Sequence, residues 1–414
     1  MNKMMILVFL LTYINLNQAL SVGTFLQITD IHFDQYYTPG SSANCYFGST
    51  GLGCCRRLSI SKEPYRTASK WGDYNCDLPL LFVNESFRWI SSNIKTPDFI
   101  IWNGDSVDHH DITQTLNSNI EEINIITKLF SEYFNQIAIV PMIGNHDTYP
   151  IDQVYYNFNE TELSYELSVV WKDMIPQEQL YTFSYGGYYT VNLTSNVSLM
   201  IINSLLYDNN NIYSYLVDDP SNQKQWINQT LNRLRNEHKR VWIAGHIPLN
   251  SVECNETFSK WFYDICIEYS DIIQYQFWGH THDDYYYLIM DNENPVGFHY
   301  VSPSLTADWR FSSFREYLYD RETMQILDYS HYVANLTDII INNKIDYTLE
   351  YMAKQNYMIK SFDPDGYYDF YQRLNKNDTL FQSYYSHYTP GFNLGYCNQT
   401  CKQNYIKEIV SLMH

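Results

Sequence analysis

Short apolar runs alternate with longer amphipathic segments along most of the chain. The runs TFLQIT, DFIIWN, IAIVPMI, VSLMII, KRVWIA, YQFW and FHYVS are rich in β-branched and aromatic residues and bounded by polar or turn-forming residues, which predicts strands. Helical spacing of apolar residues predicts helices over 80–94, 112–134 and 222–235. The alternation predicts an α/β fold whose ligand sites collect at the carboxyl ends of buried strands. After about residue 335 the strand pattern fades, and we expect a small helical appendage closed by CNQTC.

The first twenty residues predict a secretory signal peptide. One lysine precedes an apolar stretch over about 4–11, and small residues follow near Ala19 and Ser21. The stretch is too short and too interrupted for a firm membrane anchor, and no later apolar run is long enough to span a bilayer. We therefore expect a secreted or lumenal protein, either extracellular or in an acidic endolysosomal compartment.

Composition supports the secretory route and limits the partners. The eight cysteines form an even number, as expected for paired thiols in an oxidising compartment. The formal charge of -20 argues against a nucleic-acid polymer as partner, because a phosphate backbone needs a cationic face. Sequons for N-glycosylation occur at Asn84, Asn159, Asn192, Asn196, Asn228, Asn255, Asn335, Asn377 and Asn398.

Histidine, aspartate and asparagine recur directly after the predicted strands. They are Asp30 and His32 after TFLQIT, Asp105 and His109 after DFIIWN, Asn145 and His146 after IAIVPMI, His246 after KRVWIA, and His280 and His282 after YQFW. One such cluster alone is an ordinary polar turn, but recurrence after five strands indicates a divalent-metal site, since imidazole and carboxylate are good zinc ligands.

Spacing within the clusters suggests how the side chains converge. In D-x-H and H-x-H the two residues are two apart, so along an extended segment both side chains would point to one face. Glycine precedes Asp105, Asn145, His246 and His280, which allows a sharp turn and close approach of the backbone to an anion.

The order D-x-H, G-D, G-N-H, G-H, G-H-x-H resembles the calcineurin-like metallophosphoesterase superfamily. Three features resemble its acid sphingomyelinase and acid sphingomyelinase-like phosphodiesterase branch: GDSVDH, the insert NCYFGSTGLGCCRR…KWGDYNCDLPL, and CNQTC. The resemblance extends over about 25–401. It implies a four-layer fold with a central β-sandwich flanked by helices, a catalytic domain over 21–335 and a helical subdomain over 336–414.

The resemblance also implies a site with two zinc ions about 3.5–4 Å apart, and a metal-bridging hydroxide that attacks phosphorus. One ion would be held by Asp30, His32, Asp105 and His282, and the other by Asp105, Asn145, His246 and His280. His109 would be the general acid and His146 would assist it. Asp108, His110, Asp111, Asp283 and Asp284 would be supporting or solvated residues.

The family pattern implies the disulfides Cys45–Cys54, Cys55–Cys76 and Cys397–Cys401. Cys254 and Cys266 remain, and we expect them to pair, although that bridge departs from the family pattern.

The implied function is that of a secreted, monomeric phosphodiesterase that converts sphingomyelin to ceramide and phosphocholine with possible peripheral membrane contact. Acid sphingomyelinases carry a saposin-like domain ahead of the catalytic domain, whereas about ten mature residues are expected before Asp30. A soluble nucleotide, phosphodiester or phosphoanhydride is therefore an alternative substrate.

Two other classes compete with this interpretation. Purple acid phosphatases place a metal-binding tyrosine three residues after the G-D aspartate, where this chain has Asp108. A secreted glycoprotein without activity would be expected to lose motif positions, and all of them are present here.

Overall fold

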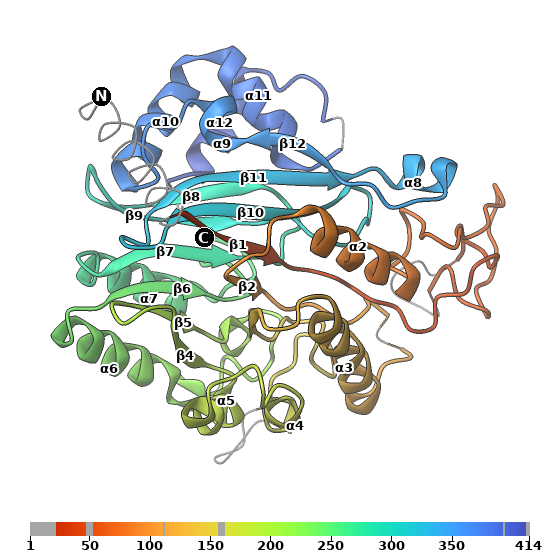
Figure 1. Ribbon diagram of the computed structural model, residues 1–414, viewed down its shortest axis with the longest axis horizontal. Coiled ribbons are helices and arrows are strands. Elements are labelled where there is room, and N and C mark those ends of the chain that lie inside the picture. Colours follow the sequence, from red (N-terminus) through yellow and green to blue (C-terminus); the bar gives the residue numbers. More distant parts are fainter. Residues whose placement is uncertain (1–21, 47–52, 111, 156–161, 392–393, 411–414) are drawn as a thin grey trace, which may run out of the picture.

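Two six-stranded β-sheets form the centre of the molecule in the computed structural model (Figure 1). The structure describes residues 22–46, 53–110, 112–155, 162–391 and 394–410. The signal peptide expected over 1–20 and the sequon at Asn159 lie outside these ranges.

Each sheet mixes parallel and antiparallel strands. The first sheet has the order β12 (Thr348–Met352), β11 (Ile326–Ala334), β10 (Ser312–Asp320), β1 (Val22–Ile28), β2 (Phe99–Trp102), β3 (Ala138–Pro141). The second has the order β4 (Tyr189–Asn192), β5 (Val197–Ile201), β6 (Arg240–Ala244), β7 (Ile273–Trp278), β9 (Asn294–Val301), β8 (Tyr285–Asp291). The strands β1, β2 and β3 run parallel, as do β5, β6, β7 and β9, so their carboxyl ends lie at common sheet edges.

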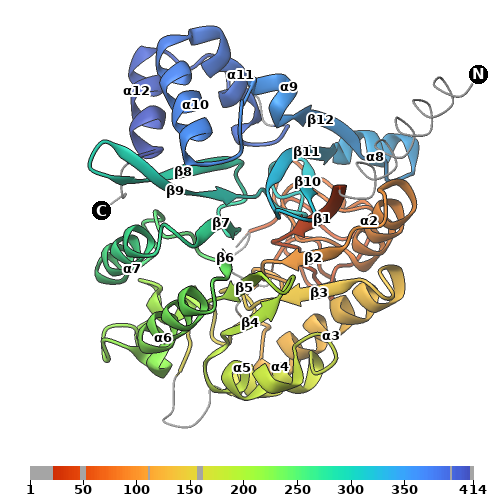
Figure 2. The ribbon, with the colours of Figure 1, turned by 60° about the vertical axis from the view of Figure 1, so that its left-hand side comes forward.

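Helices cover the outer faces of the sheets (Figure 2). Beside the first sheet lie α2 (Leu80–Asn93) and α3 (Leu116–Tyr133), and beside the second lie α6 (Gln223–Asn236) and α7 (Glu256–Glu268). The short helices α4 (Glu162–Val170) and α5 (Leu180–Gly186) pack together at one end. The C-terminal part contains α8 (Leu336–Asn342), α9 (Ala353–Tyr357), α10 (Pro364–Lys376), α11 (Asp378–Tyr388) and α12 (Gln399–Glu408).

Aromatic side chains fill the space between the two sheets. Phe25 of β1 stacks on Phe99 and Tyr317 in its own sheet, with ring centroids 4.7 and 4.6 Å apart. Across the sandwich it contacts Trp242 and Phe277, each at 5.5 Å. Large apolar rings buried from both sides join the sheets into one core. The expected sandwich flanked by helices is therefore confirmed.

The predicted strands and helices are confirmed, with one shorter helix. α3 begins at Leu116 rather than at Ile112, because the side chain of Thr115 caps the helix and forms a capping box with Ser118. The strands β4, β8, β10, β11 and β12 were not predicted, and β10 and β11 show why. Each of these two carries a fully buried basic residue at a core position, Arg315 and His331, so its sequence lacks a simple apolar pattern. The C-terminal part is mainly helical but also contributes β12.

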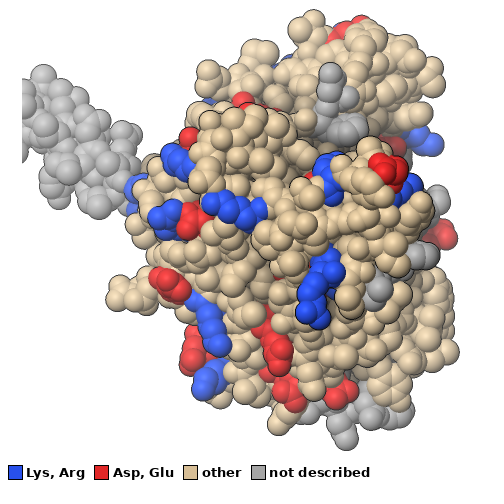
Figure 3. All heavy atoms as spheres, turned by 90° about the vertical axis from the view of Figure 1, so that its right-hand side faces the viewer, with Lys and Arg blue, Asp and Glu red and all other residues tan. Residues whose placement is uncertain are grey.

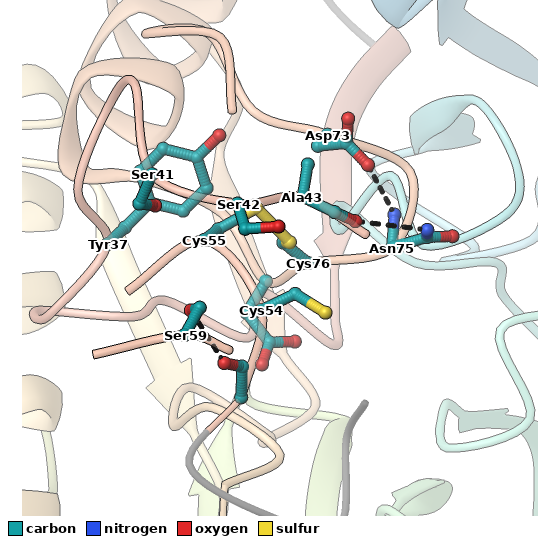
Figure 4. Close-up of a disulfide and its surroundings, with 12 residues drawn as sticks. Tyr37, Ser41, Ser42, Ala43, Cys54, Cys55, Ser59, Asp73, Asn75 and Cys76 are labelled. Atoms are coloured by element: carbon teal, nitrogen blue, oxygen red, sulfur yellow. Dashed lines mark hydrogen bonds between the residues drawn. A yellow bond between two sulfur atoms is a disulfide. The ribbon is translucent and has the colours of Figure 1, made fainter. Parts of the chain in front are cut away.

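Disulfides join Cys45 to Cys54, Cys55 to Cys76, and Cys397 to Cys401. Figure 4 shows the second of them, close to Asp73 and Asn75.

The pairing of Cys254 with Cys266 was wrong, because both are buried free thiols. Cys254 lies just before α7 and Cys266 lies near its end. A rise of about 1.5 Å per residue separates their Cα atoms by roughly 15 Å, and a disulfide spans at most about 7 Å.

Sequon asparagines often cap helices in this fold. Asn255, Asn335, Asn377 and Asn398 are the N-cap residues of α7, α8, α11 and α12, and each accepts backbone N–H groups of its helix. Within the described ranges, no helix combines the length and apolarity needed to cross a membrane.

Candidate metal centre

Loops at the carboxyl ends of parallel strands from both sheets bring the predicted ligands together. The residues and the strands they follow are Asp30 and His32 (β1), Asp105 (β2), Asn145 (β3), His246 (β6), and His280 and His282 (β7). Among the described residues, four groups have potential ligand atoms within 4.8 Å of one another, and three of them contain predicted ligands: Asp30, His32 and Asp105; Asp105, His246 and His280; and His32, His109 and His282.

Positive φ angles, rather than an extended backbone, direct these side chains to the centre. The values are 52° for Asp30, 44° for His32, 50° for Asp105, 73° for His280 and 58° for His282. Left-handed backbone is uncommon for residues with side chains and clusters at functional sites. The prediction that D-x-H and H-x-H converge because they are extended was therefore wrong, although Oδ1 of Asp30 does lie 4.0 Å from Nε2 of His32.

Asp105 occupies the position shared by the two expected ligand sets. Its Oδ2 atom lies 3.5 Å from Nε2 of His32 and 3.2 Å from Nε2 of His246. On one side, Oδ1 of Asp30 lies 3.4 Å from Nε2 of His282. On the other, Oδ1 of Asn145 lies 2.8 Å from Nε2 of His246. A carboxylate has two oxygens, so Asp105 can contact both sets at once.

The donor set fits divalent cations. Nδ1 of His32 donates to the carbonyl of Val107 at 2.9 Å, and Nδ1 of His246 donates to the carbonyl of Asn103 at 2.7 Å. A carbonyl can only accept, so Nε2 of each neutral ring is itself an acceptor.

When the rings are neutral, as metal ligands must be, these acceptors face other acceptors. Nε2 of His32 lies 3.1 Å from Nε2 of His282, and Nε2 of His246 faces the amide oxygen of Asn145. Converging lone pairs of nitrogen and oxygen are the arrangement that a Zn²⁺-type ion stabilises.

Two buried side-chain amides connect the loops that come from the two sheets. Asn103 donates from Nδ2 to the carbonyls of Gly245 and Phe277, at 2.9 and 3.0 Å, across the sandwich. Gln27 donates to Oδ1 of Asn103 and to the carbonyl of Trp278, both at 3.0 Å. These bonds tie the loops that follow β6 and β7 to the loop that follows β2.

Asp147 fixes two of the loops to each other. Its carboxylate accepts backbone N–H groups from Asp105, Ser106 and Gly144, at 3.2, 2.7 and 2.8 Å. Gly144 is required at this contact, because a Cβ there would lie 2.1 Å from Oδ1 of Asp105.

Two further histidines lie beside the ligands, and their surroundings shift their pKa values in opposite directions. Nδ1 of His109 lies 2.6 Å from Oδ1 of Asp77. Burial disfavours the charged ring, but the Asp77 carboxylate outweighs burial and raises the pKa of His109. Burial and the neighbouring His109 lower the pKa of His146 to about 3. The ring centroids of His109 and His146 are 4.3 Å apart, so an imidazole whose charged form is favoured lies beside one whose neutral form is favoured.

A buried ionic network supports the His109 loop from the cysteine-bearing segment. Arg56 bonds Asp34 through Nε and Asp108 through Nη2, at 2.8 and 2.7 Å. His110 contacts Asp108 and Asp77, at 3.2 and 3.1 Å. Asp111 lies outside the described ranges. Asp108 and His110 therefore hold the loop in place and do not face the ligands.

Asp283 and Asp284 anchor the loop that carries His280 and His282. Asp283 accepts from Nη1 of Arg310 at 3.0 Å. The buried Asp284 pairs with the fully buried Arg315 and accepts from the hydroxyl of Tyr351. Both aspartates are supporting residues rather than solvated ones.

Sequence reasoning missed several residues around the centre. Asp308 lies 3.2 Å from Nδ1 of His282, and Glu253 contacts Nε2 of His280. Neither of these, nor Asp77, stands in a strand-end motif. Of these supporting residues, only Asp147 could have been found from the sequence, because it directly follows the G-N-H motif.

Comparison with known proteins gives matches over nearly the whole chain. Residues 23–284 match the family described as calcineurin-like phosphoesterase, and residues 296–414 match the acid sphingomyelin phosphodiesterase C-terminal region. The "sphingomyelinase phosphodiesterase C" of Dictyostelium discoideum is 31% identical over 94% of this chain and 91% of its own length. Sphingomyelin phosphodiesterase 2 of Caenorhabditis elegans is 30% identical over 93% of this chain and 68% of its own length. A cyclic GMP-AMP phosphodiesterase of Homo sapiens is 28% identical over 96% of this chain and 89% of its own length.

Proposed function

The chain belongs to the acid sphingomyelinase-like family of calcineurin-like phosphoesterases, and on this premise we propose that it is a secreted phosphodiesterase with two zinc ions. One observation carries the proposal. Potential ligand atoms of Asp30, His32, Asp105, Asn145, His246, His280 and His282 lie close together in two overlapping groups, and His109, whose pKa is raised, lies beside them.

Bound zinc ions would supply Lewis-acid polarisation of a phosphoryl group and a water-derived nucleophile. Asp105 would be shared between them, with Asp30, His32 and His282 on one side and Asn145, His246 and His280 on the other. The imidazole, carboxylate and amide donors suit zinc.

His109 would act as the general acid in P–O cleavage. As the oxygen of water bonds to phosphorus and loses a proton to the solvent, the bond to the leaving oxygen would break, and His109 would give that oxygen a proton from Nε2. Asp77 on Nδ1 keeps the ring charged and oriented for this transfer. The neutral His146, whose Nδ1 has no partner among the described residues, would hydrogen-bond to the phosphoryl group or the leaving group.

The substrate we propose is sphingomyelin, which would give ceramide and phosphocholine. Relatives named as sphingomyelin phosphodiesterases support this choice. A cyclic dinucleotide is the second candidate, because a relative of comparable coverage is named as a cyclic GMP-AMP phosphodiesterase.

The test is a direct comparison of substrates. Purified, zinc-supplemented protein would be given sphingomyelin in liposomes, cyclic GMP-AMP, and bis-p-nitrophenyl phosphate. We expect phosphocholine release and turnover of the soluble diester. Hydrolysis of cyclic GMP-AMP without phosphocholine release would identify the cyclic dinucleotide, and not sphingomyelin, as the substrate. If none of the diesters is hydrolysed, the enzyme assignment is overturned.

A further inference from the structure

The segment cross-linked by the disulfides Cys45–Cys54 and Cys55–Cys76 has an exposed surface with both apolar and basic side chains. Leu58, Ile60 and Tyr65 are 66%, 55% and 71% exposed, and every residue from 60 to 67 is exposed. An exposed large apolar residue alone is ordinary, whereas several within eight positions on a fixed loop are typical of an interaction surface.

Basic residues are concentrated in the same segment of an acidic protein. Residues 56–70 contain five basic residues and one acidic residue, within a chain of net charge -20. Arg56 and Arg66 are neutralised by Asp34, Asp108 and Asp73. Among the described residues, none forms an ion pair with Arg57, Lys62 or Lys70. Figure 3 looks onto this side of the molecule, and Lys and Arg side chains lie across the middle of it.

The surface is rigidly connected to the metal centre. Cys55 is bonded to Cys76, which directly precedes Asp77, and Asp77 holds His109. Gly53, at the foot of the same loop, packs so closely on His110 that a Cβ would lie 2.1 Å from its ring. The segment is therefore fixed relative to His109, as a docking element for an interfacial reaction must be.

A further exposed aromatic residue is hydrogen-bonded to the cysteine-bearing insert and follows a residue that contacts the centre. Trp309 is 65% exposed, and its backbone N–H donates to the carbonyl of Tyr74 at 3.1 Å. The preceding residue, Asp308, contacts His282. A hollow of about 610 Å³, lined by Tyr36, Arg57, Leu58 and Thr113 among others, lies at the foot of the segment.

We propose that residues 57–65, extended by Trp309, dock the enzyme on a bilayer that contains anionic lipid, so that the metal centre meets a membrane-borne substrate. The inference rests on the proposed phosphodiesterase function and narrows its substrate to an interfacial lipid. Tyrosine and tryptophan suit the membrane interface, and leucine and isoleucine would enter the acyl boundary. Arg57, Lys62 and Lys70 would contact lipid phosphates, each contributing attraction near an anionic surface. A nucleic-acid polymer fits less well, because the rest of the chain is acidic and the cations alternate with apolar side chains.

The test is co-sedimentation of the full chain with vesicles of phosphatidylcholine alone or with phosphatidylserine. We expect binding to the anionic vesicles, and a fall in the partition coefficient of at least about tenfold for the variant L58S/I60S/Y65S. The variant R57Q/K62Q/K70Q should lose the preference for anionic vesicles by a similar factor. The matched control is V169S/Y181S, which removes exposed apolar side chains from α4 and α5 and should bind like the wild type.

Turnover of bis-p-nitrophenyl phosphate separates this proposal from the proposed function. Both surface variants should keep soluble turnover and lose hydrolysis of vesicle-borne sphingomyelin. A wild type that hydrolyses the soluble diester without binding vesicles, or an L58S/I60S/Y65S variant that binds normally, would overturn the docking surface. If salt abolished vesicle binding while the serine substitutions left it unchanged, that result would indicate another polyanionic partner and would also overturn the docking surface. Vesicle binding without any diester hydrolysis would leave docking intact and remove the proposed function.

Discussion

Asp77 places a carboxylate oxygen 2.6 Å from Nδ1 of His109, although 32 residues separate the two in the chain. A second oxygen of Asp77 accepts the backbone N–H of His109 at 3.0 Å, so ring and backbone are held together. This contact gives the proposed general acid its charge and orientation.

Asp77→Asn should lower kcat by about 10- to 100-fold with unchanged zinc content, because the ring of His109 loses its anionic partner. Turnover and bound zinc would be measured on the same samples. The loss should be larger for sphingomyelin than for a p-nitrophenyl diester, whose leaving group needs no proton. Asp98→Asn, which removes a surface carboxylate paired with Arg321, is the matched control. Equal losses on the two substrates would contradict the role of His109 as general acid.

Asp105→Asn should reduce the zinc content of both positions, since Oδ2 of Asp105 lies between His32 and His246. His246→Ala should remove only one ion. Zinc per chain would be determined by elemental analysis, with circular dichroism to check the fold. Retention of two ions by Asp105→Asn would refute the shared position.

Two free thiols should be found per chain in denaturant without reductant, and all eight cysteines should react after reduction. In the native protein neither thiol should react with Ellman's reagent. Burial raises the pKa of Cys254 and of Cys266 to about 12, so little thiolate forms at neutral pH. The absence of free thiols in denaturant would instead support a fourth disulfide.

The contribution of Asp208 to stability should fall as the pH rises from about 4 to about 8. Burial raises the pKa of Asp208 to about 8, despite a hydrogen bond from the N–H of Asn210. In the unfolded chain its pKa is about 3.9, so between these values ionisation favours the unfolded state. The contribution is at most about 1.4 kcal/mol per pH unit. The free energy of unfolding of Asp208→Asn, taken relative to that of the wild type, should therefore increase with pH, as measured with urea at pH 5, 6.5 and 8. If the free energy of unfolding of the variant changed with pH in the same way as that of the wild type, the raised pKa of Asp208 would be contradicted.

Arg315→Met should destabilise the fold by about 3–5 kcal/mol, because it leaves Asp284 charged and buried without its partner. The double variant R315M/D284L should recover much of that loss, since it removes both charges. Urea unfolding of the two single variants and the double variant completes the cycle. Additive effects would show that the pair is not energetically linked.

The strand-end motifs were sufficient to predict which residues form the centre. Strands such as β2 and β7 are apolar and β-branched or aromatic, so the polar residues after them stand out clearly. Three disulfides and the sandwich followed from resemblance over nearly the whole chain. The strands β10 and β11 escaped prediction because burial of Arg315 and His331 breaks the apolar pattern, and only the pairing of Arg315 with Asp284 across the fold makes the burial of that charge tolerable.

By itself, the sequence determined the α/β class and the family and indicated the candidate ligands, because strand patterning and short motifs are local properties of the chain. The tertiary structure alone decided how those residues converge, since left-handed backbone at Asp30, His32, Asp105, His280 and His282 depends on the packing around each loop. It also decided that Cys254 and Cys266 stay apart, because an intervening helix separates them, and that Asp77 supports His109. Contacts between residues distant in sequence are fixed by the packing of whole elements, and no local pattern encodes them.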